Sequence, residues 1–157
     1  MRSLGLCCLL ALLVACAREE PADSAAAADS TAMPMPAPAE ASLASYAGTW
    51  NMETMGMGSD SVLFRFTMTA TADTTGWVYN FPGKAPVPIR ILSVEPDGSV
   101  ISEAGPYDSN LRPGTPVTAR VVTRRSGDLL TSDVVSTFQG GGADSVLNLR
   151  ARGTRAP

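Results

Sequence analysis

Side chains that could catalyse a reaction are scarce in this chain, which narrows the possible chemistry. The sequence has no histidine, so a His-based triad, a His metal site and the commonest general base near neutral pH are all excluded. Most carboxylates fall at turns or at polar positions of the hydropathy pattern, where solvated charges are expected. We therefore expect neither an enzyme nor a cofactor. The carboxylates weighed as a possible acid–base pair are Glu53, Asp60, Glu95, Asp97, Glu103 and Asp133.

Three methionines have a spacing that could hold a metal ion. Met52, Met55 and Met57 form the pattern M-x-x-M-x-M, and thioether ligands of this kind select Cu(I). On an extended strand Met52 points to one face and the other two to the opposite face, so they converge only if the strand bends at Gly56. Methionines are adaptable core residues, and we favour that interpretation over a copper site.

Cys16 has the most specific predicted chemistry. It follows Leu13-Val14-Ala15 at the end of an apolar run, and Arg2 lies before that run. About 11 apolar residues suit the h-region of an export signal and are too few to span a bilayer as a helix. The stretch resembles the lipobox of bacterial lipoproteins. The resemblance implies that residues 1–15 are a cleaved signal peptide and that acylated Cys16 makes the membrane a partner.

The residues after Cys16 indicate where the protein lies and how it is tethered. Ala17 replaces the Asp that, in the proteobacterial scheme, keeps lipoproteins in the inner membrane, so the resemblance implies an outer-membrane lipoprotein facing the periplasm or the surface. Residues 16–42 combine Ala, Pro and acidic residues without apolar periodicity, which predicts a lipidated N-terminus followed by a disordered linker. The net charge of −3 argues against nucleic acid as a partner.

Residues 43–157 alternate apolar and polar side chains and are predicted to form a β domain. The alternation is clearest in Val62–Ala70, and a turn at 73–76 makes a hairpin with the following aromatic segment. Residues 105–114 contain so many helix and strand breakers that we expect the longest loop there. The expected strands are Thr49–Met57, Val62–Ala70, 77–81, Val87–Glu95, Ser99–Ala104, Val117–Arg124, Leu129–Phe138 and Ser145–Arg152.

Eight strands in sequence order, with short connections and no convincing helix, favour an all-β, eight-stranded antiparallel up-and-down barrel. Closure would remove the exposed edges of an open sheet. A two-sheet β-sandwich is the alternative, and 105–114 is the one connection long enough for its crossover. We expect a monomer.

The start of the first strand and the end of the last resemble a known superfamily. Tyr46-Ala47-Gly48-Thr49-Trp50 contains the Gly-x-Trp that opens the first strand of calycins, which include lipocalins and avidins. In lipocalins an arginine from the end of the barrel packs on this tryptophan. The resemblance implies a lipocalin-like barrel in which Arg152 packs on Trp50 and closes one end, a cation–π contact of about 0.5 to 2 kcal/mol. It carries over no ligand.

Two hypotheses about function remain ahead of copper binding. In the first, the barrel binds a small apolar or amphipathic ligand; in the second, its interior is packed and the protein has a structural or interaction role. Eight strands suit either, so cavity size must decide: a lumen below about 100 Å³ has no room for a ligand, whereas binding pockets run from about 300 Å³. The predicted ligand-binding residues are Phe64, Phe66, Met68, Trp77 and Tyr79.

Overall fold

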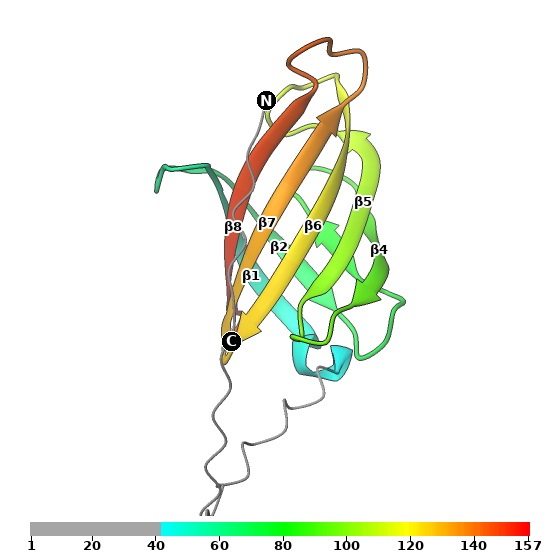
Figure 1. Ribbon diagram of the computed structural model, residues 1–157, viewed down its shortest axis with the longest axis vertical. Coiled ribbons are helices and arrows are strands. Elements are labelled where there is room, and N and C mark those ends of the chain that lie inside the picture. The colour runs from blue at the N-terminus through cyan, green and yellow to red at the C-terminus, as the bar shows by residue number, and fades with distance from the viewer. Residues whose placement is uncertain (1–41) are drawn as a thin grey trace, which may run out of the picture. The chain divides into compact units, whose positions relative to one another are not determined.

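The computed structural model describes residues 42–157, which form one β-barrel (Figure 1). A single turn of 3-10 helix, Leu43–Tyr46, comes before the first strand, and the Ser42 hydroxyl caps it by accepting a hydrogen bond from Ala44 N at 3.0 Å. The strands are β1 Gly48–Gly56, β2 Val62–Ala70, β3 Val78–Asn80, β4 Val87–Val94, β5 Val100–Asp108, β6 Pro116–Ser126, β7 Leu129–Phe138 and β8 Val146–Arg155.

The strands form a closed barrel in sequence order, and every neighbouring pair is antiparallel. The barrel closes where β1 pairs with β8, from Trp50 opposite Arg155 to Gly56 opposite Leu149. The predicted up-and-down barrel is confirmed, and the alternative of a β-sandwich is wrong. None of the helices in residues 42–157 is long and apolar enough to cross a membrane.

The connection between β5 and β6 is shorter than the sequence predicts. Residues 105–108 were expected to lie in a loop, but β5 continues to Asp108 through an irregularity after Ala104. Gly105 makes this possible, because its φ is +119° and an added Cβ would lie 2.6 Å from the carbonyl oxygen of Val117. Only glycine fits there, so a residue that reads as a strand breaker instead lets the strand bend and continue.

One end of the barrel is sealed by the largest buried side chains. Trp50 and Tyr46 are 0% and 2% exposed, and Met68, Trp77 and Leu130 are also buried. The Trp50 indole donates a hydrogen bond to Tyr46 O at 2.8 Å, and the Tyr46 hydroxyl donates to Gly98 O at 2.7 Å. The 3-10 turn is thereby fixed across this end, which we call the closed end. The other end is bordered by the loops after β1, β3, β5 and β7, and we call it the open end.

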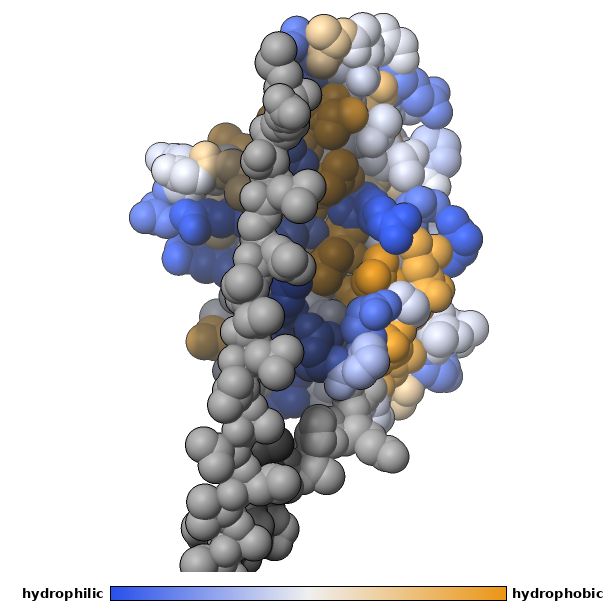
Figure 2. Space-filling view, in the orientation of Figure 1, coloured by the Kyte–Doolittle hydropathy of each residue, from blue (hydrophilic) through white to orange (hydrophobic). Residues whose placement is uncertain are grey.

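The outer wall follows the polar half of the alternation, with charged and apolar residues side by side (Figure 2). Four cross-strand ion pairs join outward-facing residues of neighbouring elements: Arg65–Glu53, Arg90–Glu103, Arg124–Asp133 and Arg152–Glu53. Exposed apolar residues also occur, including Leu92 and Val94 of β4 at 36% and 38% exposed.

Candidate functional site

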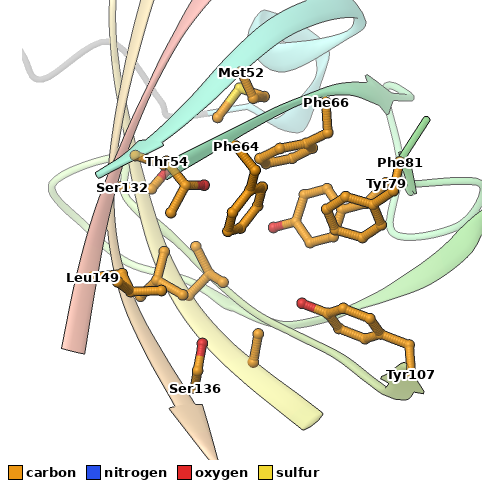
Figure 3. Close-up of a pocket in the computed structure, with 14 residues that line it drawn as sticks. Met52, Thr54, Phe64, Phe66, Tyr79, Phe81, Tyr107, Ser132, Ser136 and Leu149 are labelled. Carbon is orange, nitrogen blue, oxygen red and sulfur yellow. The ribbon is translucent and has the colours of Figure 1, made fainter. Parts of the chain in front are cut away.

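The barrel interior keeps one small cavity toward the open end. Its volume is about 40 Å³, room for one or two water molecules. Side chains from β1, β2, β3, β5, β6, β7 and β8 line it, and aromatic rings occupy one side of it (Figure 3). A pocket for a small ligand is several times larger, so the lumen is filled in this structure.

The aromatic side of the cavity is a continuous cluster of rings. Phe66 lies between Tyr79 and Phe81, with ring centroids 5.2 Å and 5.0 Å away. Phe81 also stacks on Tyr107 at 5.4 Å, and Phe64 is 5.9 Å from Phe66. Tilted and edge-to-face contacts at these distances add about 0.5 to 1.5 kcal/mol each to the free energy of area burial, so the cluster is a stable filling of the lumen.

The opposite side of the cavity is made of small and hydroxyl-bearing residues. Thr54, Ser132 and Ser136 are 3%, 4% and 5% exposed and line the cavity together with Ala119 and Ala151. Figure 3 shows Ser132 and Ser136 across the lumen from the rings, whereas Thr54 lies beside Phe64, its partner on β2. Short side chains on β6–β8 thus leave the space that the aromatic residues of β2, β3 and β5 fill.

The two tyrosines of the cluster remain neutral at physiological pH. Burial raises the pKa of Tyr79, and the nearby Tyr107 raises it further. Burial also raises the pKa of Tyr107 to about 12. Their hydroxyl groups therefore act as hydrogen-bond donors and acceptors at the cavity and not as bases.

The structure brings together three of the five predicted ligand-binding residues. Phe64, Phe66 and Tyr79 line the cavity, whereas Met68 and Trp77, each 2% exposed, belong to the core. The Trp77 indole donates a hydrogen bond to Asp73 O at 2.8 Å, and its ring lies 5.9 Å from Tyr46. The alternation that placed all five on one face is correct, but one face of a strand runs from the open end to the closed end.

Two aromatic residues of the cavity, Phe81 and Tyr107, were missing from the predicted ligand-binding set. Phe81 continues the alternation of Trp77 and Tyr79 and could have been included on that signal. Tyr107 lies in the segment predicted as a loop, and no local pattern indicates that it points inward. The irregularity of β5 decides its direction.

The arginine that packs on Trp50 is Arg155, and the prediction of Arg152 is wrong. The Arg155 guanidinium carbon lies 4.3 Å from the centroid of the Trp50 ring, and its Nη1 donates to Ala47 O at 2.8 Å. Arg152 faces outward and donates to Glu53. The register explains the difference, because β8 extends to Arg155 and pairs that residue with Trp50, whereas Arg152 pairs with Glu53.

The three methionines considered for copper do not meet. Met52 points into the barrel and lines the cavity. Met55 pairs with the outward-facing Arg150 on β8, and Met57 is 62% exposed in the turn after β1. An irregularity between Thr54 and Met55 is present, but it does not bring the thioethers to one point.

The candidate carboxylates are not paired with one another either. Glu53 accepts hydrogen bonds from Arg152 and Arg65, which lower the pKa of its carboxyl group. Of the others, Asp60 pairs with Arg150, Glu103 with Arg90 and Asp133 with Arg124. The ion pairs between neighbouring strands stabilise strand pairing, and the lowered pKa of Glu53 is unlike that of a general acid.

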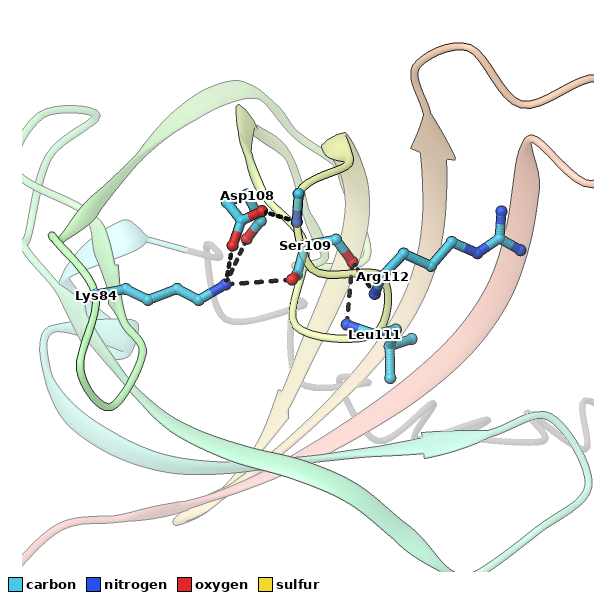
Figure 4. A network of polar contacts seen from close by, with 6 residues as sticks. Lys84, Asp108, Ser109, Leu111 and Arg112 are labelled. Atoms are coloured by element: carbon cyan, nitrogen blue, oxygen red, sulfur yellow. Dashed lines mark hydrogen bonds and ion pairs between the residues drawn. The ribbon is translucent and has the colours of Figure 1, made fainter.

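At the open end a polar network ties two loops together. The Lys84 ammonium donates to Asp108 Oδ2 and O, both at 2.8 Å, and to Ser109 O at 3.2 Å (Figure 4). The other Asp108 carboxylate oxygen accepts from Gly114 N at 2.6 Å. Arg112 places its guanidinium carbon 4.2 Å from the centroid of the Phe138 ring. The β3–β4 and β5–β6 loops are thereby held beside the aromatic cluster.

The predicted lipid attachment residue Cys16, the predicted signal peptide and most of the predicted linker lie outside the residues that the structure describes. Comparison of the chain with protein-family models, with curated proteins and with solved structures gave no match.

Proposed function

We propose that this protein is a lipid-anchored protein of the bacterial cell envelope that acts through the surface of a packed barrel. The observation that carries the proposal is the filled lumen: the cavity of about 40 Å³ is far below the size at which a small molecule is enclosed. With the interior occupied by its own side chains, recognition falls to the outer wall and the loops.

The anchor part of the proposal rests on the lipobox. A single acyl chain holds a protein only marginally at a membrane, so several chains on Cys16 would give stable attachment. With Ala17 after the cysteine, the outer membrane is the favoured location. The Ala- and Pro-rich segment that follows would separate the barrel from the lipid headgroups.

The barrel itself is similar to calycins in several respects. It has eight antiparallel strands, Gly48-Thr49-Trp50 opens the first, and an arginine from the last packs on Trp50. These features support an assignment to a lipocalin-like superfamily. They describe how one barrel end is built and say nothing of a ligand.

Binding of a small amphipathic molecule in the lumen is the second candidate. Phe64, Phe66 and Tyr107 are only half-buried, so the aromatic cluster that lines the cavity borders solvent. A ligand there would meet rings on one side and the hydroxyl groups of Ser132 and Ser136 on the other.

Titration with an environment-sensitive fluorescent fatty acid tests the choice between the two candidates. If the barrel is packed, the wild-type chain should give no saturable change in fluorescence. Phe81→Ala opens a new void in the interior and should give only a small increase in fluorescence. Saturable binding by the wild type at micromolar concentrations would refute the packed barrel and establish the carrier. Leu92→Ala on the outer wall is the matched control.

A further inference from the structure

The barrel wall is split on one side of β2. Strand β3 pairs only with the second half of β2, from Thr67 opposite Asn80 to Thr69 opposite Val78. Residues 62–66 pair with β1 on one side, and no other strand of residues 42–157 faces them on the second side. The hairpin formed by β1 and β2 projects from the wall at this point (Figure 1). A half-strand with free backbone groups is therefore open to solvent.

The chain beyond β3 cannot close this split. After Asn80 it turns at Pro82-Gly83, with Lys84 N donating to Phe81 O at 3.1 Å. Pro82, the residue after Phe81, has no N–H group to donate to β2, and the chain then continues to β4, where Pro88 pairs with Val78 of β3. Arg65, Thr67 and Asn80 border a surface groove that continues across the outer wall over β1, β7 and β8.

The free half of β2 carries one exposed charge, on Arg65, and its pairing with β1 is irregular near Val62. Residues 62–66 contain no proline and no lysine, and Leu63 is 48% exposed. Phe64 and Phe66 are half-buried on the inner side of the same segment. An exposed edge of this kind is a template for another strand, and apolar side chains beside it would contribute to binding.

The charge beside the edge is positive. Glu53 accepts from Arg65 Nε and from Arg152 Nε, both at 2.9 Å, so one carboxylate serves two guanidinium groups. The Arg65 side chain, on the free edge, is 69% exposed. Across the split the charge of Lys84 is met by Asp108 at 2.8 Å. Because Arg65 shares Glu53 with Arg152, an acidic side chain from a partner would give Arg65 a second ion pair.

From this combination we infer that the free edge of β2 binds an extended peptide segment of a partner protein in which apolar and acidic residues alternate. The segment adds to the sheet beside residues 62–66. Its apolar side chains lie beside Phe64 on the inner side, next to the Phe81 ring that already packs on Phe66, and an acidic side chain lies next to Arg65 on the outer side. The inference rests on the proposed function, since it names the partner of a surface that acts when the lumen is filled.

The test uses fluorescence anisotropy with the chain from residue 16 onward carrying Cys16→Ser. The probe is a fluorescein-labelled peptide with the repeat Glu-Val, compared with a Lys-Val peptide and with a Glu-Val peptide N-methylated at every residue, which has no backbone N–H group to donate along either edge. We expect the Glu-Val peptide alone to bind, more weakly as salt rises.

Two variants with equal exposure separate a specific from a general charge effect. Arg65→Gln should weaken binding about threefold to fivefold, as expected for loss of one exposed ion pair. Arg90→Gln removes a side chain that is also 69% exposed, far from the edge on β4, and should leave binding unchanged. Circular dichroism of both variants shows whether the barrel is intact.

Several outcomes would overturn the inference. They are absence of binding up to about 1 mM peptide, equal binding of the acidic and basic peptides, undiminished binding of the methylated peptide, or equal losses in the two variants. Dimers seen by sedimentation that the peptide does not dissociate would assign the edge to a second copy of this chain. None of these results bears on the fatty-acid titration, so the packed barrel stands or falls separately.

Discussion

Removal of the Arg155 side chain tests how the closed end is held, and Arg152→Ala provides the comparison. The two arginines lie on the same strand three residues apart, but only Arg155 covers Trp50. We expect Arg155→Ala to destabilise the barrel clearly and Arg152→Ala to have less than half that effect.

The size of the Arg155 effect follows from its contacts. The cation–π contact at 4.3 Å is partly shielded, since the side chain is 33% exposed, and contributes about 1 kcal/mol. The hydrogen bond to Ala47 O at 2.8 Å contributes about 1 kcal/mol more. The ion pair with Asp128, which is 77% exposed, adds little. The expected loss is about 2 kcal/mol.

Arg152 makes no comparable contact. Its side chain is 59% exposed and its partner Glu53 keeps a second ion pair with Arg65 when Arg152 is removed. No buried group is left unpaired, so the variant should unfold nearly as the wild type does. Arg155→Lys, which keeps the charge but not the planar fork, should lie between the two.

Urea unfolding followed by tryptophan fluorescence measures these differences. Both tryptophans are buried, so the signal reports unfolding of the barrel. A drop of about 2 kcal/mol is a large share of the stability of a domain this size. Equal losses in the two alanine variants, or a larger loss for Arg152→Ala, would refute the role given to the register of β8.

Four further predictions follow from the same structure. Trp77→Ala should cost about 3 to 5 kcal/mol in urea unfolding, because Trp77 is 2% exposed in the core, and a loss below about 1 kcal/mol would contradict that packing. Cys16→Ser should leave the precursor uncleaved and unlabelled by a fatty-acid probe; persistent labelling would end the lipoprotein interpretation. Burial raises the pKa of Tyr107 from 10.0 to about 12. The stability contributed by the neutral, buried Tyr107 is therefore complete below about pH 10 and is lost as the pH rises toward 12. Because phenylalanine does not ionise, Tyr107→Phe should raise the pH midpoint of alkaline unfolding. The hydrogen bond from Lys84 lowers the pKa of Asp108 below 3.8. The stability contributed by the ionised Asp108 is therefore present above that pH and is lost as the pH falls. The stability of Asp108→Asn should depend less on pH in acid, and an unchanged acid profile would count against the loop network.

The eight strands and most of their limits can be predicted from the residue pattern alone. Residues that alternate between lumen and solvent produce a period of two, which can be read without knowing the partner strand. Turn residues such as Pro96-Asp97-Gly98 then separate the strands, and Gly98 adopts a φ of +89° there. The aromatic cluster was also visible in part, because Phe64, Phe66 and Tyr79 occupy inward positions of adjacent strands.

Register along the barrel was decided by the tertiary structure. Irregularities in the pairing of β1, β4 and β5 shift which residues face inward beyond them, and they depend on contacts with neighbouring strands. For this reason Tyr107 joins the cavity. Arg155, not Arg152, covers Trp50 because β8 extends to Arg155 and pairs that residue with Trp50. The period of two shows which face of the sheet a residue lies on but not how far it lies along the barrel. That position along the barrel distinguishes the cavity residue Phe66 from the core residue Met68.

The filling of the lumen and the split beside β2 are likewise properties of the folded chain. The cavity of about 40 Å³ results from rings on one wall meeting small residues that are distant in sequence, such as Ala119 and Ser132. The split exists because β3 pairs with only half the length of β2. Composition and periodicity describe each strand by itself, whereas volume and free edges depend on how far neighbouring strands run together.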